Sequence, residues 1–333
     1  MTANKPLMTA DDVQGAWAII PTPATEEASD WRSAHTVDLD ATTEAVEGLI
    51  AAGIDGILTL GTLGECGSLS REEKRDFMSA VAETARGRVP VFGGSSTLST
   101  RETIAQTRTA RDIGMNGVMV GPPMWNTPDT AMAVQFYREL AEAVPDMALC
   151  VYANPYVFKF EFPRPFWAQV AEIPQVIMAK VAGYATMLAD LRLSRGRIRL
   201  MPIDAEYYGA ARLAPEQCTA FWSSSAACGP APAIALRDRV AAAKKDGDWA
   251  AAEALSQEIT AAIMPIICYG DMAAFQVHNT ALEKGRMNTA GWMKAGPNRP
   301  PYHLVPDHIA DFARTGGELW AALQKKYSGN TPS

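Results

Sequence analysis

The sequence predicts an α/β fold, a (β/α)8 TIM barrel followed by a C-terminal helical extension. Short apolar runs rich in β-branched residues alternate with longer segments of helical spacing, and eight such runs precede residue 245. Near-continuous apolar strands separated by helices are typical of a parallel sheet that is covered on both faces. The first run is followed by no Gly-x-Gly-x-x-Gly motif, which a doubly wound dinucleotide-binding sheet would normally carry, so we expect a closed barrel.

The elements follow one another in a regular order. We expect strands at residues 15–23, 56–61, 89–96, 117–123, 147–155, 175–182, 197–203 and 219–226. The clearest helical segments between them are residues 41–53, 70–86, 100–113, 128–144 and 230–245. Ser70 and Glu73 form the pattern of a capping box, and Gly87 and Gly114 occupy positions typical of helix C-termini.

The expected barrel occupies residues 1–245, which leaves residues 246–333 for the extension. Residues 248–264, 271–290 and 306–327 have the spacing of three helices. No linker or low-complexity segment separates the two parts. We therefore interpret the extension as an appendage of the barrel.

Composition excludes several classes of function. The chain has 30 Lys and Arg against 37 Asp and Glu, a formal net charge of −7, and no basic cluster of the kind that binds nucleic acid. Neither a membrane-spanning run nor a secretory signal is visible. The five cysteines are scattered without a C-x-x-C pair, and the four histidines lack metal-ligand spacing. We expect a cytoplasmic protein without a metal.

Three polar residues at predicted strand ends are candidates for catalysis. Lys180 lies within the apolar run VIMAKVAG, where desolvation disfavours the ammonium and favours a nucleophilic amine. Tyr152 ends the fifth strand and can transfer protons, and Asn154 can orient a substrate oxygen. A lysine that reaches solvent and a tyrosine that lines the barrel are the alternative interpretations of the first two residues.

A glycine-bearing turn follows the second strand. In GTLGE, residues 61–65, the glycines allow backbone N–H groups to converge on an anion, beside the Thr62 hydroxyl. The alternative is an ordinary turn between a strand and a helix. We expect Glu65 to form hydrogen bonds within its own turn and not to act as the base.

The combination of these motifs resembles the dihydrodipicolinate synthase/N-acetylneuraminate lyase family of class I, Schiff-base aldolases. The resemblance extends from AIIPTP in the first strand to NRPPYHLVP near the C-terminus. It implies that Lys180 forms an imine with a 2-oxo acid, that Tyr152 relays protons to and from this imine, and that the Thr62–Leu63 turn beside Gly61 holds the carboxylate. It also implies a homotetramer, and no cofactor other than the covalent lysine imine.

Departures from the family pattern indicate an aromatic substrate. Leu63 replaces the second threonine of the synthases, Val157 replaces their arginine, and Met124 and Trp125 replace a pair of tyrosines. An aryl group suits the apolar pocket that we expect, with Trp125 and Trp222 as stacking surfaces. Two further residues are candidate substrate contacts, Ser223 and Asn279, although Asn279 fits a helix-surface amide equally well.

Within the family, GAWAIIPTP, GTLGEC, AFWSSSAACGP and KAGPNRPPYHLVP resemble the hydratase-aldolases of polycyclic aromatic hydrocarbon breakdown. This implies a lyase that converts a benzylidenepyruvate and water to an aromatic aldehyde and pyruvate. We expect trans-2′-carboxybenzalpyruvate as substrate, giving 2-carboxybenzaldehyde. The alternative is trans-o-hydroxybenzylidenepyruvate, giving salicylaldehyde. A synthase or sugar-acid lyase, and a barrel that only senses a ligand, remain as further alternatives.

Overall fold

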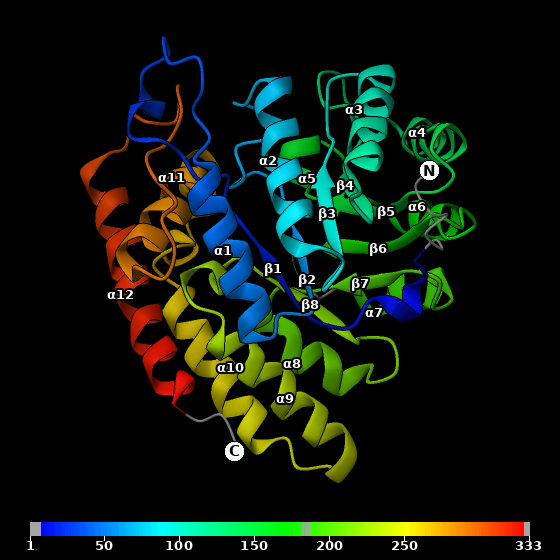
Figure 1. The fold of residues 1–333 in the computed structure, drawn as a ribbon. Coiled ribbons are helices and arrows are strands. Elements are labelled where there is room, and N and C mark those ends of the chain that lie inside the picture. Colours follow the sequence, from blue (N-terminus) through cyan, green and yellow to red (C-terminus); the bar gives the residue numbers. More distant parts are fainter. Residues whose placement is uncertain (1–7, 182, 184–186, 330–333) are drawn as a thin grey trace.

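The computed structural model describes residues 8–181, 183 and 187–329. Its centre is an eight-stranded parallel sheet with the order β7-β6-β5-β4-β3-β2-β1-β8, which the helices surround (Figure 1). A parallel bridge between Ile203 and Trp222 joins the β7 side to β8, so the sheet closes on itself. The predicted (β/α)8 barrel is confirmed.

The strands are shorter than the apolar runs that predict them. They are β1 (Gly15–Ile19), β2 (Gly56–Leu58), β3 (Val91–Gly94), β4 (Gly117–Val120), β5 (Ala148–Ala153), β6 (Val176–Val181), β7 (Arg199–Met201) and β8 (Ala220–Ser223). The end of each predicted run instead begins the loop at the carboxyl end of the barrel, where apolar residues are also buried. Residue 182, the last of the predicted sixth strand, lies outside the described residues, as do residues 1–7 and 330–333 of the two predicted domains.

Helices follow the strands around the barrel. They are α1 (Leu39–Ala52), α2 (Arg71–Ala85), α3 (Thr100–Ile113), α4 (Thr130–Ala143), α5 (Pro155–Phe158), α6 (Arg164–Val170), α7 (Met187–Ser194), α8 (Asp204–Leu213) and α9 (Ala231–Asp246). The Ser70–Glu73 capping box at the start of α2 is present. Gly114 ends α3 in the left-handed conformation, as its position predicts, whereas Arg86 caps α2 one residue before Gly87.

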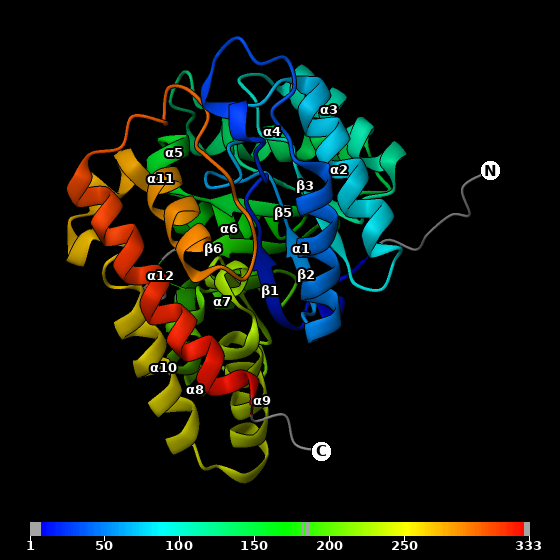
Figure 2. The ribbon, with the colours of Figure 1, turned by 60° about the vertical axis from the view of Figure 1, so that its left-hand side comes forward.

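The C-terminal segment forms the three predicted helices, α10 (Ala250–Ile263), α11 (Met272–Ala290) and α12 (Asp307–Ser328). They gather along one side of the barrel next to α8 and α9, and α12 packs on α11, α10 and α9 (Figure 2). The long loop between α11 and α12 returns to the carboxyl end of the strands. This return brings residues of the extension next to the turn after β2.

Candidate active site

Lys180 and Tyr152 lie side by side on adjacent strands. They are direct partners in the parallel register of β5 and β6, so both side chains leave the same face of the sheet. The Lys180 ammonium nitrogen is 4.7 Å from the centre of the Tyr152 ring. Lys180 is half-buried, and no described carboxylate forms an ion pair with it. The nucleophile predicted from the sequence therefore lies beside its predicted proton relay.

The Tyr152 hydroxyl connects the strand to the turn after β2. It forms a 2.8 Å hydrogen bond with the Thr62 hydroxyl, and the Asn154 side-chain amide donates to it at 3.5 Å. Burial raises the pKa of Tyr152, but the charge of Lys180 and the hydrogen bonds from Thr62 and Asn154 outweigh burial. The pKa of Tyr152 therefore lies below its usual value. This favours proton exchange near neutral pH.

Trp222 covers Lys180 from β8. The Lys180 nitrogen lies 3.6 Å from the centre of the Trp222 ring, and the indole N–H donates to the Val181 carbonyl at 2.9 Å. Trp222 is buried, and one ring face is occupied by the ammonium. Trp222 thus shapes the surroundings of the nucleophile, a role different from the open stacking surface that we expected.

A cavity of about 670 Å³ opens beside these residues. Gly61, Thr62, Tyr152 and Asn279 are among its lining residues, so four of the predicted site residues share one space. Asn279 is half-buried, and its side-chain oxygen is buried without a hydrogen-bond partner among the described residues. An unpaired buried acceptor is costly, so this oxygen is available to a donor on a ligand.

Other predicted contacts lie elsewhere. Trp125 is 75% exposed and does not line the cavity, because the loop after β4 turns the preceding residue, Met124, inward instead. Leu63 is buried, and Val157 lines the cavity, as its apolar side chain suggests. The expected stacking on Trp125 is therefore absent from this chain's own cavity.

Ser223 does not point at a ligand. Its hydroxyl donates to buried Asp204 at 2.5 Å and accepts from the Ala226 N–H at 3.0 Å. Burial raises the pKa of Asp204 to about 6. Ser223 was expected to contact the substrate, but its hydroxyl is engaged inside the protein, because the fold buries Asp204, 19 residues away in sequence, next to it.

A second ionic group lies beside this pair and joins β8 to α11. Ser224 donates to Glu283, and Arg286 donates to Ser224 at 2.8 Å and pairs with Glu283 at 2.5 Å. The Ser224 hydroxyl is thus also engaged inside the protein.

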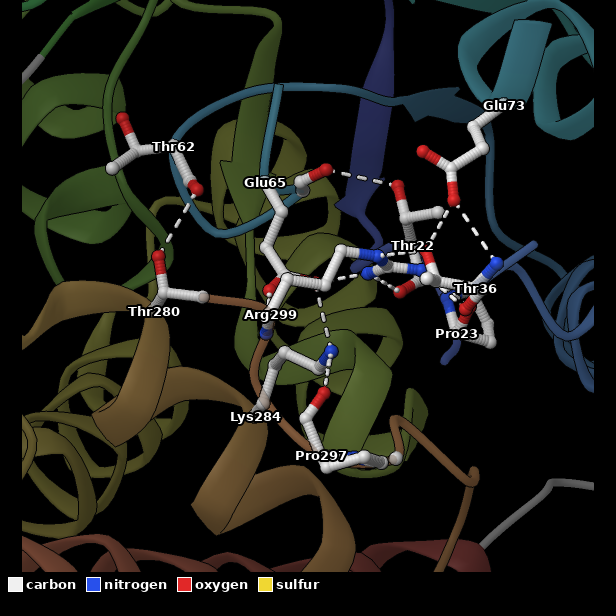
Figure 3. Close-up of polar contacts among 12 residues, drawn as sticks. Thr22, Pro23, Thr36, Thr62, Glu65, Glu73, Thr280, Lys284, Pro297 and Arg299 are labelled. Carbon is white, nitrogen blue, oxygen red and sulfur yellow. Dashed lines mark hydrogen bonds and ion pairs between the residues drawn. The ribbon is translucent and has the colours of Figure 1, made fainter. Parts of the chain in front are cut away.

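Glu65 corrects another expectation. Its carboxylate pairs with Lys284 of α11 at 2.8 Å and with Arg299 of the following loop, and it accepts from the Arg299 backbone N–H at 2.8 Å (Figure 3). These partners are more than 200 residues away in sequence, and the expected hydrogen bonds of the Glu65 side chain within its own turn are not found. Sequence reasoning missed Lys284 and Arg299, which stand in polar stretches of the sequence with no local signal of this pairing.

The described residues also bear on the cysteines and on metal-ligating side chains. No group of three or more metal-ligating side chains occurs in the described ranges, and all five cysteines are free thiols. Burial raises the pKa of Cys66, which keeps this cavity-lining thiol protonated. Within the described helices, none combines the length and hydropathy that a bilayer crossing requires.

Comparisons with known proteins agree with the family resemblance that the sequence motifs indicate. The model of the "Dihydrodipicolinate synthetase family" matches residues 26–195. The "Trans-O-hydroxybenzylidenepyruvate hydratase-aldolase" of Pseudomonas putida is 56% identical over 321 residues, with 96% of this chain and 97% of the relative covered. The "Trans-2'-carboxybenzalpyruvate hydratase-aldolase" of Nocardioides sp. (strain KP7) is 35% identical over 328 residues, with 97% of this chain and 98% of the relative covered.

A solved structure described as "PhdJ bound to substrate intermediate" superposes with a TM-score of 0.94 at 40% identity, covering 97% of this chain and 100% of that one. The barrel, the strand-end lysine and tyrosine, and these similarities over almost the whole length lead to one conclusion. This chain belongs to the dihydrodipicolinate synthetase family and is a lyase of its class I aldolase type.

Proposed function

We propose that this protein is a Schiff-base hydratase-aldolase that cleaves an ortho-hydroxylated benzylidenepyruvate to an aromatic aldehyde and pyruvate. The observation that carries the proposal is the position of Lys180, half-buried between two aromatic rings and next to the Tyr152 hydroxyl system. No carboxylate of the described residues forms an ion pair with its nitrogen, and a lysine amine is the nucleophile that forms a Schiff base with a ketone.

The chemistry uses this geometry in successive steps. The Lys180 amine adds to the ketone carbon and water leaves, giving an iminium conjugated with the alkene. Water then adds at the benzylic carbon, and a proton is taken up at the neighbouring carbon. Loss of the new hydroxyl proton breaks the carbon–carbon bond, which releases the aldehyde and leaves an enamine. Protonation and hydrolysis of the enamine release pyruvate and restore the amine, so one water is consumed overall.

Tyr152 is the group that we assign to proton transfer at the imine. Its hydroxyl is held by Thr62 and Asn154, and its lowered pKa suits transfer in both directions. The backbone of the Gly61–Leu63 turn is assigned to the substrate carboxylate, next to the Thr62 hydroxyl that faces the cavity.

Two observations favour an ortho-hydroxyl over the ortho-carboxylate that we first expected. Relatives named for the hydroxyl substrate are 55–56% identical to this chain, against 35% for the one named for the carboxylate substrate. In the cavity, the unpaired Asn279 oxygen is an acceptor, which suits a phenol donor, whereas Ser223 and Ser224 are engaged elsewhere. The comparison thus supports the alternative named from the sequence.

The test is a side-by-side ultraviolet assay with trans-o-hydroxybenzylidenepyruvate and trans-2′-carboxybenzalpyruvate. We expect a higher kcat/KM for the hydroxyl substrate, and a drop of this preference by about 10-fold in Asn279→Ala, the worth of a hydrogen bond of about 1.4 kcal/mol. His278→Ala, on the same helix but outside the cavity lining, is the control. Equal or reversed preference in the wild type would contradict the substrate assignment.

We also propose that the protein assembles as a homo-oligomer, the tetramer that the family resemblance implies. Large apolar side chains are exposed on loops, on α5 and on α11, namely Leu98, Trp125, Tyr156, Val277, Tyr302 and Leu304. Exposed apolar surface of this kind is typical of a subunit interface. Light scattering coupled to size exclusion tests this: a monomeric mass would contradict it.

A further inference from the structure

The turn after β2 is held in place by segments outside the barrel strands that carry Lys180 and Tyr152. The Thr22 hydroxyl donates to the Gly64 carbonyl at 2.9 Å, and the Thr280 hydroxyl of α11 donates to the Thr62 carbonyl at 3.3 Å (Figure 3). The turn thus depends on the segment after β1 and on the C-terminal extension.

Glu65 provides the strongest of these connections. Its side chain is fully buried, as are those of Lys284 and Arg299, with exposed fractions of 0%, 1% and 2%. Lys284 also donates to the Pro297 carbonyl at 2.6 Å. Removing one member of a buried ionic group leaves an uncompensated charge, so the three residues depend on one another.

Arg299 extends the same group to the segment after β1. Its guanidinium donates to the Thr36 hydroxyl and Thr36 carbonyl, both at 2.7 Å, and to the carbonyls of Thr22 and Pro23 at 3.2 and 3.3 Å. Thr36 in turn donates to Glu73 at the start of α2. The group therefore joins four separate segments around one turn.

The backbone of the turn has little freedom to compensate for a lost contact. Glu65 adopts a left-handed conformation, with φ of 55°, which is unfavourable for a residue with a side chain. At Gly64 an added Cβ would lie 2.9 Å from the backbone of Leu60, so the chain is tightly packed there. The turn keeps this shape because the surrounding bonds fix it.

Resting on the proposed function, we propose that Glu65, Lys284 and Arg299 are positioning residues, which hold the Gly61–Glu65 turn in the conformation that takes the substrate carboxylate. Through the same turn they place the Thr62 hydroxyl on Tyr152. The extension therefore takes part in substrate binding, although none of its ionic residues belongs to the reacting centre. The two cations against one carboxylate also leave a positive charge behind a turn assigned to an anion.

The test measures pyruvate binding directly, by the pyruvate concentration that gives half-maximal borohydride trapping on Lys180. We expect Lys284→Met to raise this concentration by about 10²-fold, because a displaced turn misplaces the carboxylate. Lys284→Arg keeps the charge and should recover most of the loss. The matched control is Lys244→Met, since Lys244 also donates to two backbone carbonyls, those of Pro215 and Cys218, far from the turn.

A pH profile separates positioning from a purely structural role. Burial is the main cause that lowers the pKa of Lys284, to about 8, with Glu65 opposing this and Arg299 adding to it. The other charged groups nearby are Glu73, reached through Thr36, and Glu283 and Arg286, which pair with each other on the same helix. Below about pH 8 Lys284 is charged and holds Glu65, and above it the pairing is lost, so pyruvate trapping should weaken as pH rises. In Lys284→Arg this decline should move to higher pH.

The outcomes are distinguishable. If the wild type forms no trapped pyruvate adduct, the proposed function fails and this inference fails with it. If the wild type is trapped but Lys284→Met matches Lys244→Met in half-saturating pyruvate while both remain folded by circular dichroism, the inference alone is overturned. An alkaline decline that stays unchanged in Lys284→Arg also overturns it, since that decline would then belong to another group, such as Tyr152.

Discussion

Two lysines near the turn after β2, half-buried Lys180 and fully buried Lys284, have contrasting surroundings. The Lys180 nitrogen contacts the faces of Tyr152 and Trp222 and forms no ion pair with a described carboxylate. The Lys284 nitrogen is bound by the Glu65 carboxylate and the Pro297 carbonyl. Burial alone therefore does not distinguish a nucleophile from a structural cation.

The difference lies in what compensates the charge. Aromatic faces stabilise an ammonium weakly, by about 0.5–2 kcal/mol, and they are the neighbours of the Lys180 nitrogen. An ion pair and a carbonyl occupy the hydrogens of Lys284 and leave no space for a reactant. The two lysines thus differ in the kind of neighbour, aromatic rings for Lys180 and a carboxylate with a carbonyl for Lys284.

We expect the largest loss of turnover from removing Lys180, the lysine that we propose as the nucleophile. Lys180→Ala should lower turnover by roughly 10⁴–10⁶-fold, because a covalent step has no substitute. Borohydride with pyruvate should add one reduced pyruvyl unit to wild type and none to Lys180→Ala, as mass spectrometry of peptides will show. An adduct that maps to another lysine, such as Lys159 or Lys284, would contradict the assignment of Lys180 as the nucleophile.

The next largest effect is expected from removing the Tyr152 hydroxyl, which lies near Lys180 and has no counterpart beside Lys284. Tyr152→Phe keeps the ring that contacts the ammonium and deletes the hydroxyl bonded to Thr62, so turnover should fall by about 10²–10⁴-fold while the fold is retained. Steady-state kinetics and a thermal melt measure the two properties. Unchanged turnover would remove Tyr152 from proton transfer.

The smallest effect is expected from changing Trp222, the aromatic side chain that lies over Lys180, and it tests what this side chain contacts. From the sequence, Trp222→Ala would weaken aryl substrates and spare pyruvate. The structure changes this expectation, because Trp222 lies against the Lys180 nitrogen. We now expect both the KM for benzylidenepyruvates and the half-saturating pyruvate concentration to rise, by about 10-fold, and Trp222→Phe to recover part of each. A rise confined to the aryl substrate would restore the original stacking role.

Local sequence pattern was sufficient to predict the barrel and to select Lys180 and Tyr152 as candidate site residues. Buried strand runs repeat eight times and alternate with helices, and each element is decided by neighbours a few residues apart. Lys180 and Tyr152 were found because a polar side chain at the end of an apolar strand is conspicuous. The division into residues 1–245 and 246–333 remains a prediction, and its proposed border falls in the last turn of α9.

The pairing of distant side chains was decided only by the tertiary structure. Ser223 was predicted to contact substrate and instead bonds to Asp204, while Trp125 was predicted to stack and is exposed. Which of two adjacent residues in a loop, Met124 or Trp125, turns inward depends on the backbone path and leaves no periodic signal.

By itself, the sequence determined the (β/α)8 barrel, the strand-end lysine and tyrosine, and the family, because these depend on short-range patterns of burial and on motifs read within a few residues. Only the tertiary structure decided that Glu65 pairs with Lys284 and Arg299, and so that the C-terminal extension supports the turn beside the nucleophile. The physical reason is that an ion pair stabilises a buried charge through distance in space, and residues separated by 219 and 234 positions carry no local trace of it.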